Sequence, residues 1–287
     1  MPPEIAPGLT WPVVAAVLLG AVLHAGWNAL VKSSGDKPLD TALVHFLGAV
    51  VALPMLLAVG LPRPETVPYI AASLTIHVGY YIALAGAYQH GDLGLTYPLM
   101  RGTAPLLVAL SASVLLGEAL SLGAWLGVVG ICAGVLSLGL SRHALDSPRA
   151  VRFALVNAVV IAIYTVVDAL GARASGNALQ YVALLFVLDG WPFGLLVLAR
   201  RGTAVALPYA RQRWPVATGA AAASLGSYGI ALWAMTQAPV ATVAALRETS
   251  VLFATLLGIW FLNEELTRRR LMGTLTIVAG VIALRLS

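Results

Sequence analysis

The chain has 287 residues, of which 60% are hydrophobic and only 10% are charged. Soluble domains carry about 25% charged residues, so this composition, with a mean hydropathy of +0.89, excludes an ordinary soluble domain and predicts a polytopic membrane protein. The net charge of +5 does not indicate binding to nucleic acid, because the basic residues lie in short segments between apolar runs. These runs are far longer than the ~10-residue strands of a membrane β-barrel, which predicts an all-α protein.

Taken in chain order, the apolar runs predict ten membrane-spanning helices, since about 20 apolar residues cross a bilayer. We expect them over residues 11–31, 41–60, 67–89, 94–116, 121–140, 150–171, 178–199, 214–236, 240–262 and 269–286. The first run lacks a basic segment before it and is too long for a cleaved signal peptide, so it is interpreted as the first helix. Cys132 is the single cysteine, which leaves no disulfide within the chain and predicts a small core residue.

The sequence repeats itself with an offset of 146 residues. Arg101 and Arg247 are related by this offset, and so are Glu118 and Glu264 at the ends of the apolar segments that follow them. Two glycines of the fifth expected helix recur in the tenth at the same offset: Gly127 as Gly273, and Gly134 as Gly280. Residues 11–140 and 150–286 are therefore interpreted as two copies of a five-helix unit. Because five is odd, the second copy is expected to be inverted in the membrane, as in many secondary transporters.

The charges of the connections predict the orientation. One side carries twelve basic residues, namely Lys32, Lys37, Arg142, Arg149, Arg152, Arg200, Arg201, Arg211, Arg213, Arg268, Arg269 and Arg270. The other side carries three, namely Arg63, Arg173 and Arg285. The positive-inside rule places the first side in the cytoplasm. Both termini are then expected outside, in a multi-pass protein of the bacterial inner membrane.

Aromatic and polar side chains recur within the expected helices at spacings that share one helix face. We expect ten of them to line a substrate cavity: Trp27, Asn28, His77, Tyr80, Tyr81, Tyr164, Asp168, Tyr228, Trp233 and Gln237. The rings would contact the apolar body of an amphipathic molecule, and the polar groups would contact its ends. The alternative for the aromatic residues is packing or an interfacial belt, and for His77 it is a hydrogen-bonded packing role.

Charged residues within a bilayer cost at least ~2.5–3.5 kcal/mol and are functional candidates by default. Arg101 and Arg247 lie about seven residues into their helices and could face a pore or snorkel to the headgroups. With Glu248 they are expected to be gate or anchor residues, Arg101 nearer the cytoplasmic mouth and Arg247 nearer the outside. Asp168 lies halfway along its helix, where it could couple protons, bind an amine or be held neutral by burial. His24 is the second candidate for proton coupling.

The sequence contains no His/Cys cluster with metal-ligand spacing, no glycine-rich phosphate loop and no Gly-x-Ser-x-Gly motif. We therefore expect no metal, no cofactor and no enzymatic activity.

Four features together resemble the drug/metabolite transporter superfamily, in its ten-helix form built from two EamA-type repeats. They are Trp27-Asn28-(x)3-Lys32, the hairpin from Arg101 to Gly117-Glu118, its repeat from Arg247 to Asn263-Glu264, and the glycine-spaced fifth and tenth helices. Within the family, the chain looks most like the YddG-type amino-acid exporters. The resemblance implies a central cavity and export of amino acids, other metabolites or drugs. The chain departs from the four-helix multidrug relatives, because His24 stands where they have a proton-coupling glutamate.

The expected function is secondary transport that exports small amphipathic metabolites, neutral or aromatic amino acids, by alternating access around a cavity near the bilayer midplane. The expected partners are a small-molecule substrate and the lipid bilayer, and the protein is expected to function as a monomer. The alternative is a proton-coupled antiporter of the same fold that exports organic cations. Ten-helix members of the family often have cytoplasmic termini, whereas the twelve-to-three charge count places the termini outside.

Overall fold

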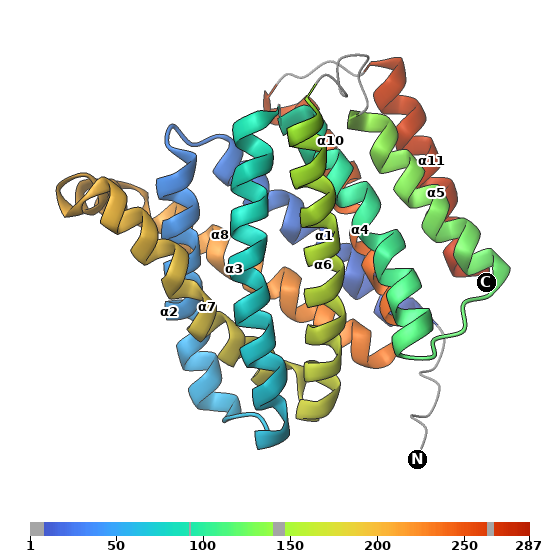
Figure 1. Ribbon diagram of the computed structural model, residues 1–287, viewed down its shortest axis with the longest axis horizontal. Helices are drawn as coiled ribbons and strands as arrows, with labels where there is room; N and C mark the ends of the chain where they lie inside the picture. The colour runs from blue at the N-terminus through green and yellow to red at the C-terminus, as the bar shows by residue number, and fades with distance from the viewer. Residues whose placement is uncertain (1–8, 92, 140–146, 263–266) are drawn as a thin grey trace.

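The computed structural model describes residues 9–91, 93–139, 147–262 and 267–287, which are helical and contain no strand (Figure 1). Arg142, Asn263 and Glu264, named above, lie outside these residues. The described elements are α1 (Trp11–Lys32), α2 (Lys37–Val59), η1 (Pro64–Thr66), α3 (Val67–His90), α4 (Leu93–Leu115), α5 (Leu122–Gly139), α6 (Pro148–Ser175), α7 (Ala178–Arg201), α8 (Thr203–Gln237), α9 (Val240–Arg247), α10 (Ser250–Leu262) and α11 (Arg268–Leu286).

Seven stretches of the described helices are long and apolar enough to cross a membrane. They are Trp11–Lys32, Lys37–Val59, Pro64–Ala87, Thr96–Leu115, Pro148–Ser175, Ala178–Arg201 and Val240–Leu257. The prediction of an all-α polytopic membrane protein is thereby confirmed.

Polar residues cap several helices where the sequence changes from turn to apolar run. The side chain of Asp36 accepts a hydrogen bond from the backbone N–H of Leu39 at the start of α2, and Asn177 does the same for Leu179 at the start of α7. These caps satisfy N–H groups that the first helical turn leaves without a partner. Gly176 ends α6 at φ 72°, a left-handed conformation that glycine adopts without strain.

One end of the helix bundle, which we call the basic face, carries the α1–α2 and α7–α8 connections. Arg201 at the end of α7 forms an ion pair with Asp36 at 3.3 Å. Arg213 of α8 donates from Nη2 to Oδ2 of Asp40 at 2.8 Å and from Nε to Oδ1 at 3.2 Å. This bidentate geometry is the strong form of an arginine–carboxylate pair. It joins the arginine-rich start of α8 to α2. The sequence predicts a connection before residue 214, whereas α8 already begins at Thr203.

The other end of the bundle, the opposite face, carries the α2–α3, α4–α5, α6–α7 and α8–α9 connections; the α2–α3 and α6–α7 connections lie at the lower edge of Figure 1. Gln180 of α7 donates to the carbonyl of Val59 at the end of α2. The guanidinium carbon of Arg285 lies 4.4 Å from the ring centroid of Trp11, so the start of α1 and the end of α11 share this face. An even number of crossings places both ends of a chain on one side.

The packing of the helices has the pattern of a two-fold arrangement. α2 packs against α7, α3 against α6, α1 against α8, α4 against α9, and α5 against α11. In the two repeats, α1 corresponds to α6, α2 to α7, α3 to α8, α4 to α9–α10, and α5 to α11. When each helix is replaced by its counterpart, every one of these contacting pairs becomes itself or another pair of the set. A two-fold axis between two copies produces this symmetry of contacts.

The α5–α11 contact shows the relation in detail. A Cβ atom at Gly127 would lie 2.8 Å from the carbonyl oxygen of Gly280, and one at Gly134 would lie 2.9 Å from that of Gly273. Glycine therefore lets the two backbones approach closely. The two helices run antiparallel, because the earlier glycine of α5 meets the later glycine of α11.

The structure corrects one expected helix. The run over 240–262 is interrupted after Arg247, where the N–H groups of Glu248 and Thr249 bond to the carbonyls three residues earlier, at 3.0 and 3.1 Å. The Glu248 carboxylate forms an ion pair with Arg101 of α4. This contact between distant parts of the chain accompanies the interruption and cannot be read from local sequence.

Candidate substrate cavity

A cavity of about 200 Å³ lies among α1, α2, α3, α4, α6, α7, α8 and α9. It approaches the basic face closely, since Asn28 and Thr41 line it only four residues from the α1 and α2 ends at that face. Every lining residue is at least seven residues from the end of its helix at the opposite face; Leu185 and Arg247 are the nearest. Seven residues of helix span ~10 Å, so the cavity is displaced toward the basic face.

Most of the predicted site residues lie in the wall of this cavity, where rings form a continuous apolar surface. The His77 ring stacks on Tyr164 with centroids 4.7 Å apart, and Tyr80 meets Tyr164 edge-on at 6.0 Å. Tyr81 packs beside Tyr80 at 5.5 Å. Asn157 fixes this part of α3 by donating its amide to the Tyr80 carbonyl at 3.0 Å. Such edge-to-face and offset pairs are the favourable arrangements of aromatic rings.

The end of α1 contributes a second part of the wall. His24, Trp27 and Asn28 all line the cavity. The His24 ring lies edge-on to Trp27 at 5.4 Å, and Asn28 donates its amide to the His24 carbonyl at 2.7 Å. The spacing of these three residues along α1 brings them to one face, as the sequence predicts.

Asp168 supports the cavity wall from behind. Its carboxylate is fully buried and accepts hydrogen bonds from the hydroxyls of Tyr181, at 2.8 Å, and Tyr228. It does not line the cavity, whereas Tyr228 does. A carboxylate that already accepts two hydroxyl donors fixes the orientation of the Tyr228 ring.

Both arginines of the repeat line this one cavity. Arg101 donates from Nη2 to Glu248 at 2.9 Å, and both side chains are largely buried. Arg247 lies instead over the face of the Tyr228 ring, with its guanidinium carbon 5.5 Å from the ring centroid. Arg101 lies near the basic-face end of α4 and Arg247 lies seven residues from the opposite-face end of α9, while the α4–α9 contact brings Arg101 next to Glu248.

Two predicted residues lie elsewhere. Trp233 and Gln237 of α8 are exposed and are absent from the cavity wall. The Gln237 amide donates to the Thr236 hydroxyl at 3.0 Å. Trp233 and Gln237 follow Tyr228 by five and nine residues, so they do not lie directly on its helix face. The face of α8 that lines the cavity carries Ser224 and Ser227 beside Tyr228.

The structure adds wall residues that the sequence reasoning missed, above all on α2 and α7. Asp189 lines the cavity and accepts a hydrogen bond from the Tyr81 hydroxyl at 3.1 Å. His45 packs edge-on against Tyr81 at 5.7 Å, and Phe186 lies 6.0 Å from Tyr228. For Asp189 the sequence signal is a charge inside an apolar helix, whereas for Phe186 it is only the spacing of one turn from Asp189.

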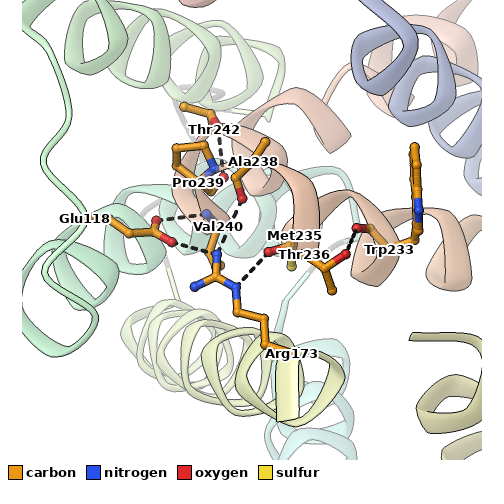
Figure 2. A network of polar contacts seen from close by, with 9 residues as sticks. All are labelled: Glu118, Arg173, Trp233, Met235, Thr236, Ala238, Pro239, Val240 and Thr242. Atoms are coloured by element: carbon orange, nitrogen blue, oxygen red, sulfur yellow. Dashed lines mark hydrogen bonds and ion pairs between the residues drawn. The ribbon is translucent and has the colours of Figure 1, made fainter. Parts of the chain in front are cut away.

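The opposite face is held together by an ion pair between α6 and the α4–α5 connection (Figure 2). Arg173 donates from Nη2 to Glu118 at 2.9 Å and from Nε to the Met235 carbonyl at 2.9 Å. The second oxygen of Glu118 accepts the backbone N–H of Val240, the first residue of α9, at 2.8 Å. We call Glu118 and Arg173 the clamp, because together they bind both sides of the α8–α9 turn.

Among the described residues, no group of three or more His, Cys, Asp or Glu side chains could hold a metal ion. The residues that line the cavity form an aromatic wall with a few charged and amide groups. Such a wall can bind one small amphipathic molecule.

The fold and the cavity define a class, that of helical membrane proteins with a central cavity between two related halves. The sequence model described as "EamA-like transporter family" matches residues 11–140 and 148–286, so it covers the chain in two repeats. The chain belongs to the EamA-like transporter family, within the drug/metabolite transporter superfamily, and is accordingly a membrane transporter.

A solved structure described only as "Crystal structure of protein" has the same fold. Its TM-score is 0.72 at 20% identity, over 95% of this chain and 98% of that chain. Comparison with curated proteins gives no match.

Proposed function

We propose that this chain is a ten-helix secondary transporter that exports small amphipathic metabolites, in particular neutral or aromatic amino acids. Its two inverted repeats would be residues 11–140 and 150–286. The antiparallel α5–α11 contact supports the inversion, since equivalent helices of inverted copies run in opposite directions. The count of ten treats α9 and α10 as one interrupted crossing and includes α5, α8 and α11.

The observation that carries the proposal is the cavity itself. The cavity has a volume of about 200 Å³. Pockets for drug-sized ligands have ~300–1,000 Å³. The cavity therefore suits a single small metabolite, and its rings suit an apolar or aromatic side chain.

The mechanism that we propose is alternating access. The cavity is displaced toward the basic face, and the clamp of Glu118 and Arg173 binds the helices together at the opposite face. In a two-fold arrangement, the second state follows when the two halves exchange their roles. The interruption after Arg247 supports such a motion, since short 3₁₀ steps inside a helix often mark hinges.

The twelve-to-three distribution of basic residues favours a cytoplasmic basic face and termini outside. A substrate would then enter from the cytoplasm and leave at the opposite face, as export requires. The scheme that we propose is that of a monomer.

The alternative substrate is an organic cation, which the Asp189 carboxylate in the cavity wall could attract. Arg247 in the same wall favours the metabolite, because it would repel a cation.

The test is uptake and counter-flow in proteoliposomes, with labelled amino acids, organic cations and nucleotide sugars at two pH values. We expect saturable flux of neutral or aromatic amino acids, reduced at least tenfold by Tyr80→Ala. Saturable flux confined to organic cations would replace the proposed substrate, and flux that never saturates would contradict secondary transport.

A further inference from the structure

The guanidinium group of Arg247 lies in the cavity wall without a counter-ion. Its equivalent in the first repeat, Arg101, is neutralised by Glu248 at 2.9 Å. No carboxylate in the described part of the chain forms an ion pair with Arg247, although its side chain lines the cavity. Arg101 and Glu248 neutralise each other, so the wall keeps two further charges, Arg247 and the Asp189 carboxylate, and the latter accepts a hydrogen bond from Tyr81. A charge at membrane depth without a partner is costly, and functional use is the default explanation.

Arg247 is also held in place for binding. Its guanidinium carbon lies 5.5 Å from the centroid of Tyr228, whose hydroxyl is fixed by the buried Asp168. Asp168 is fixed in turn by Tyr181 at 2.8 Å. Stacking on a fixed ring leaves the guanidinium edge available, and that edge matches a carboxylate with two parallel hydrogen bonds.

We propose that Arg247 binds the carboxylate of the substrate, so that the substrate class is small carboxylic acids with an apolar body, free amino acids included. This inference rests on the proposed function and gives it a specificity-determining residue. The aromatic wall of Tyr80 and Tyr164 receives the apolar body. An organic cation would place a second positive charge beside Arg247, which is unfavourable at low dielectric. A phosphate ester would need a second free cation, whereas Arg101 is paired.

The test uses three ligands with the same benzyl body: phenylalanine, 3-phenylpropanoate, which lacks the amine, and 2-phenylethylamine, which lacks the carboxylate. Dissociation constants are measured by calorimetry on the purified full chain in nanodiscs. In Arg247→Met we expect both carboxylates to bind at least about 30-fold more weakly. The amine should change by less than about threefold.

Two further variants control the result. Arg247→Lys keeps the charge but not the planar fork, so carboxylate binding should fall by an intermediate factor. Arg285→Met removes another arginine that lies over a ring, at the opposite face and outside the cavity, and should change nothing. If Arg247→Met does not stay monodisperse, the test uses Arg247→Lys, which should weaken the binding of the two carboxylates and not that of the amine.

Equal losses for all three ligands in Arg247→Met would overturn the inference, because Arg247 would then support the fold. Tighter binding of 2-phenylethylamine than of either carboxylate to the wild-type protein would also overturn the inference about Arg247. The proposal that the chain is a transporter would still stand. If the folded protein bound none of the three, the proposed substrate class and this inference would fall together.

Discussion

Weakening the clamp should open the cavity to the opposite face. Arg173→Met removes the ion pair with Glu118 and the hydrogen bond from Nε to the Met235 carbonyl. Hydrogen bonds to charged groups contribute ~1.5–3 kcal/mol each. The Arg173 side chain is 30% exposed and that of Glu118 is 12% exposed, so solvent screening reduces this contribution. A net loss of about 1.5–3 kcal/mol would lower the ratio of closed to open molecules by about 10- to 150-fold.

The assay uses the single cysteine of the chain. Cys132 is buried, and Cys132→Ala provides a cysteine-free background into which Ser224→Cys places one thiol in the cavity wall. A membrane-impermeant maleimide is then added at the opposite face of reconstituted protein. In Arg173→Met, labelling should be at least tenfold faster than in the parent.

Glu118→Gln and the double variant complete a mutant cycle. Because both residues act on one turn, their effects should be less than additive. Labelling rates within twofold of the parent in both single variants would refute the assignment of the clamp to closure of this face.

Three further outcomes follow from packing and placement. Gly280→Ala should strongly reduce the yield of folded protein, because its Cβ would lie 2.7 Å from the backbone nitrogen of Ile131. Gly219→Ala is the control, since its Cβ would meet nothing within 4 Å. Size-exclusion profiles in detergent compare the two variants, and equal profiles would contradict the close α5–α11 approach. Asp168→Ala leaves two tyrosine hydroxyls without an acceptor and should cost at least about 1 kcal/mol, seen as a melting temperature lower by roughly 2–4 °C; an unchanged melt would argue against that network. Trp233→Ala should leave ligand binding within about twofold of the parent, since the side chain lies outside the cavity, and a tenfold loss would move the site.

The sequence predicts the helices and the repeat because these depend on local hydropathy and on residue spacing. It also predicts that His77 and Tyr80 share one face, and both lie in the cavity wall. The position of Asp189 beside Trp191-Pro192 favours a structural pairing role at a kink, and its place in the cavity wall is not predicted because α7 is apolar on several faces, so its pattern does not indicate which face turns inward. Asp168 turned out to stand behind the wall, because Tyr181, thirteen residues further on, supplies its partner.

The interruption between α9 and α10 was missed for a similar reason. Glu248 turns toward Arg101, which is distant in sequence. A continuous apolar run gives no sign of an ion pair that only the packing of two repeats brings together.

Exchange in proteoliposomes tests whether the chain is a secondary transporter of phenylalanine. Vesicles containing the full chain are loaded with unlabelled phenylalanine and diluted into labelled phenylalanine. We expect saturable uptake that internal substrate accelerates. Tyr228→Ala should reduce this uptake at least tenfold, and Arg285→Met should not. Uptake that rises linearly with concentration and ignores internal substrate would contradict secondary transport.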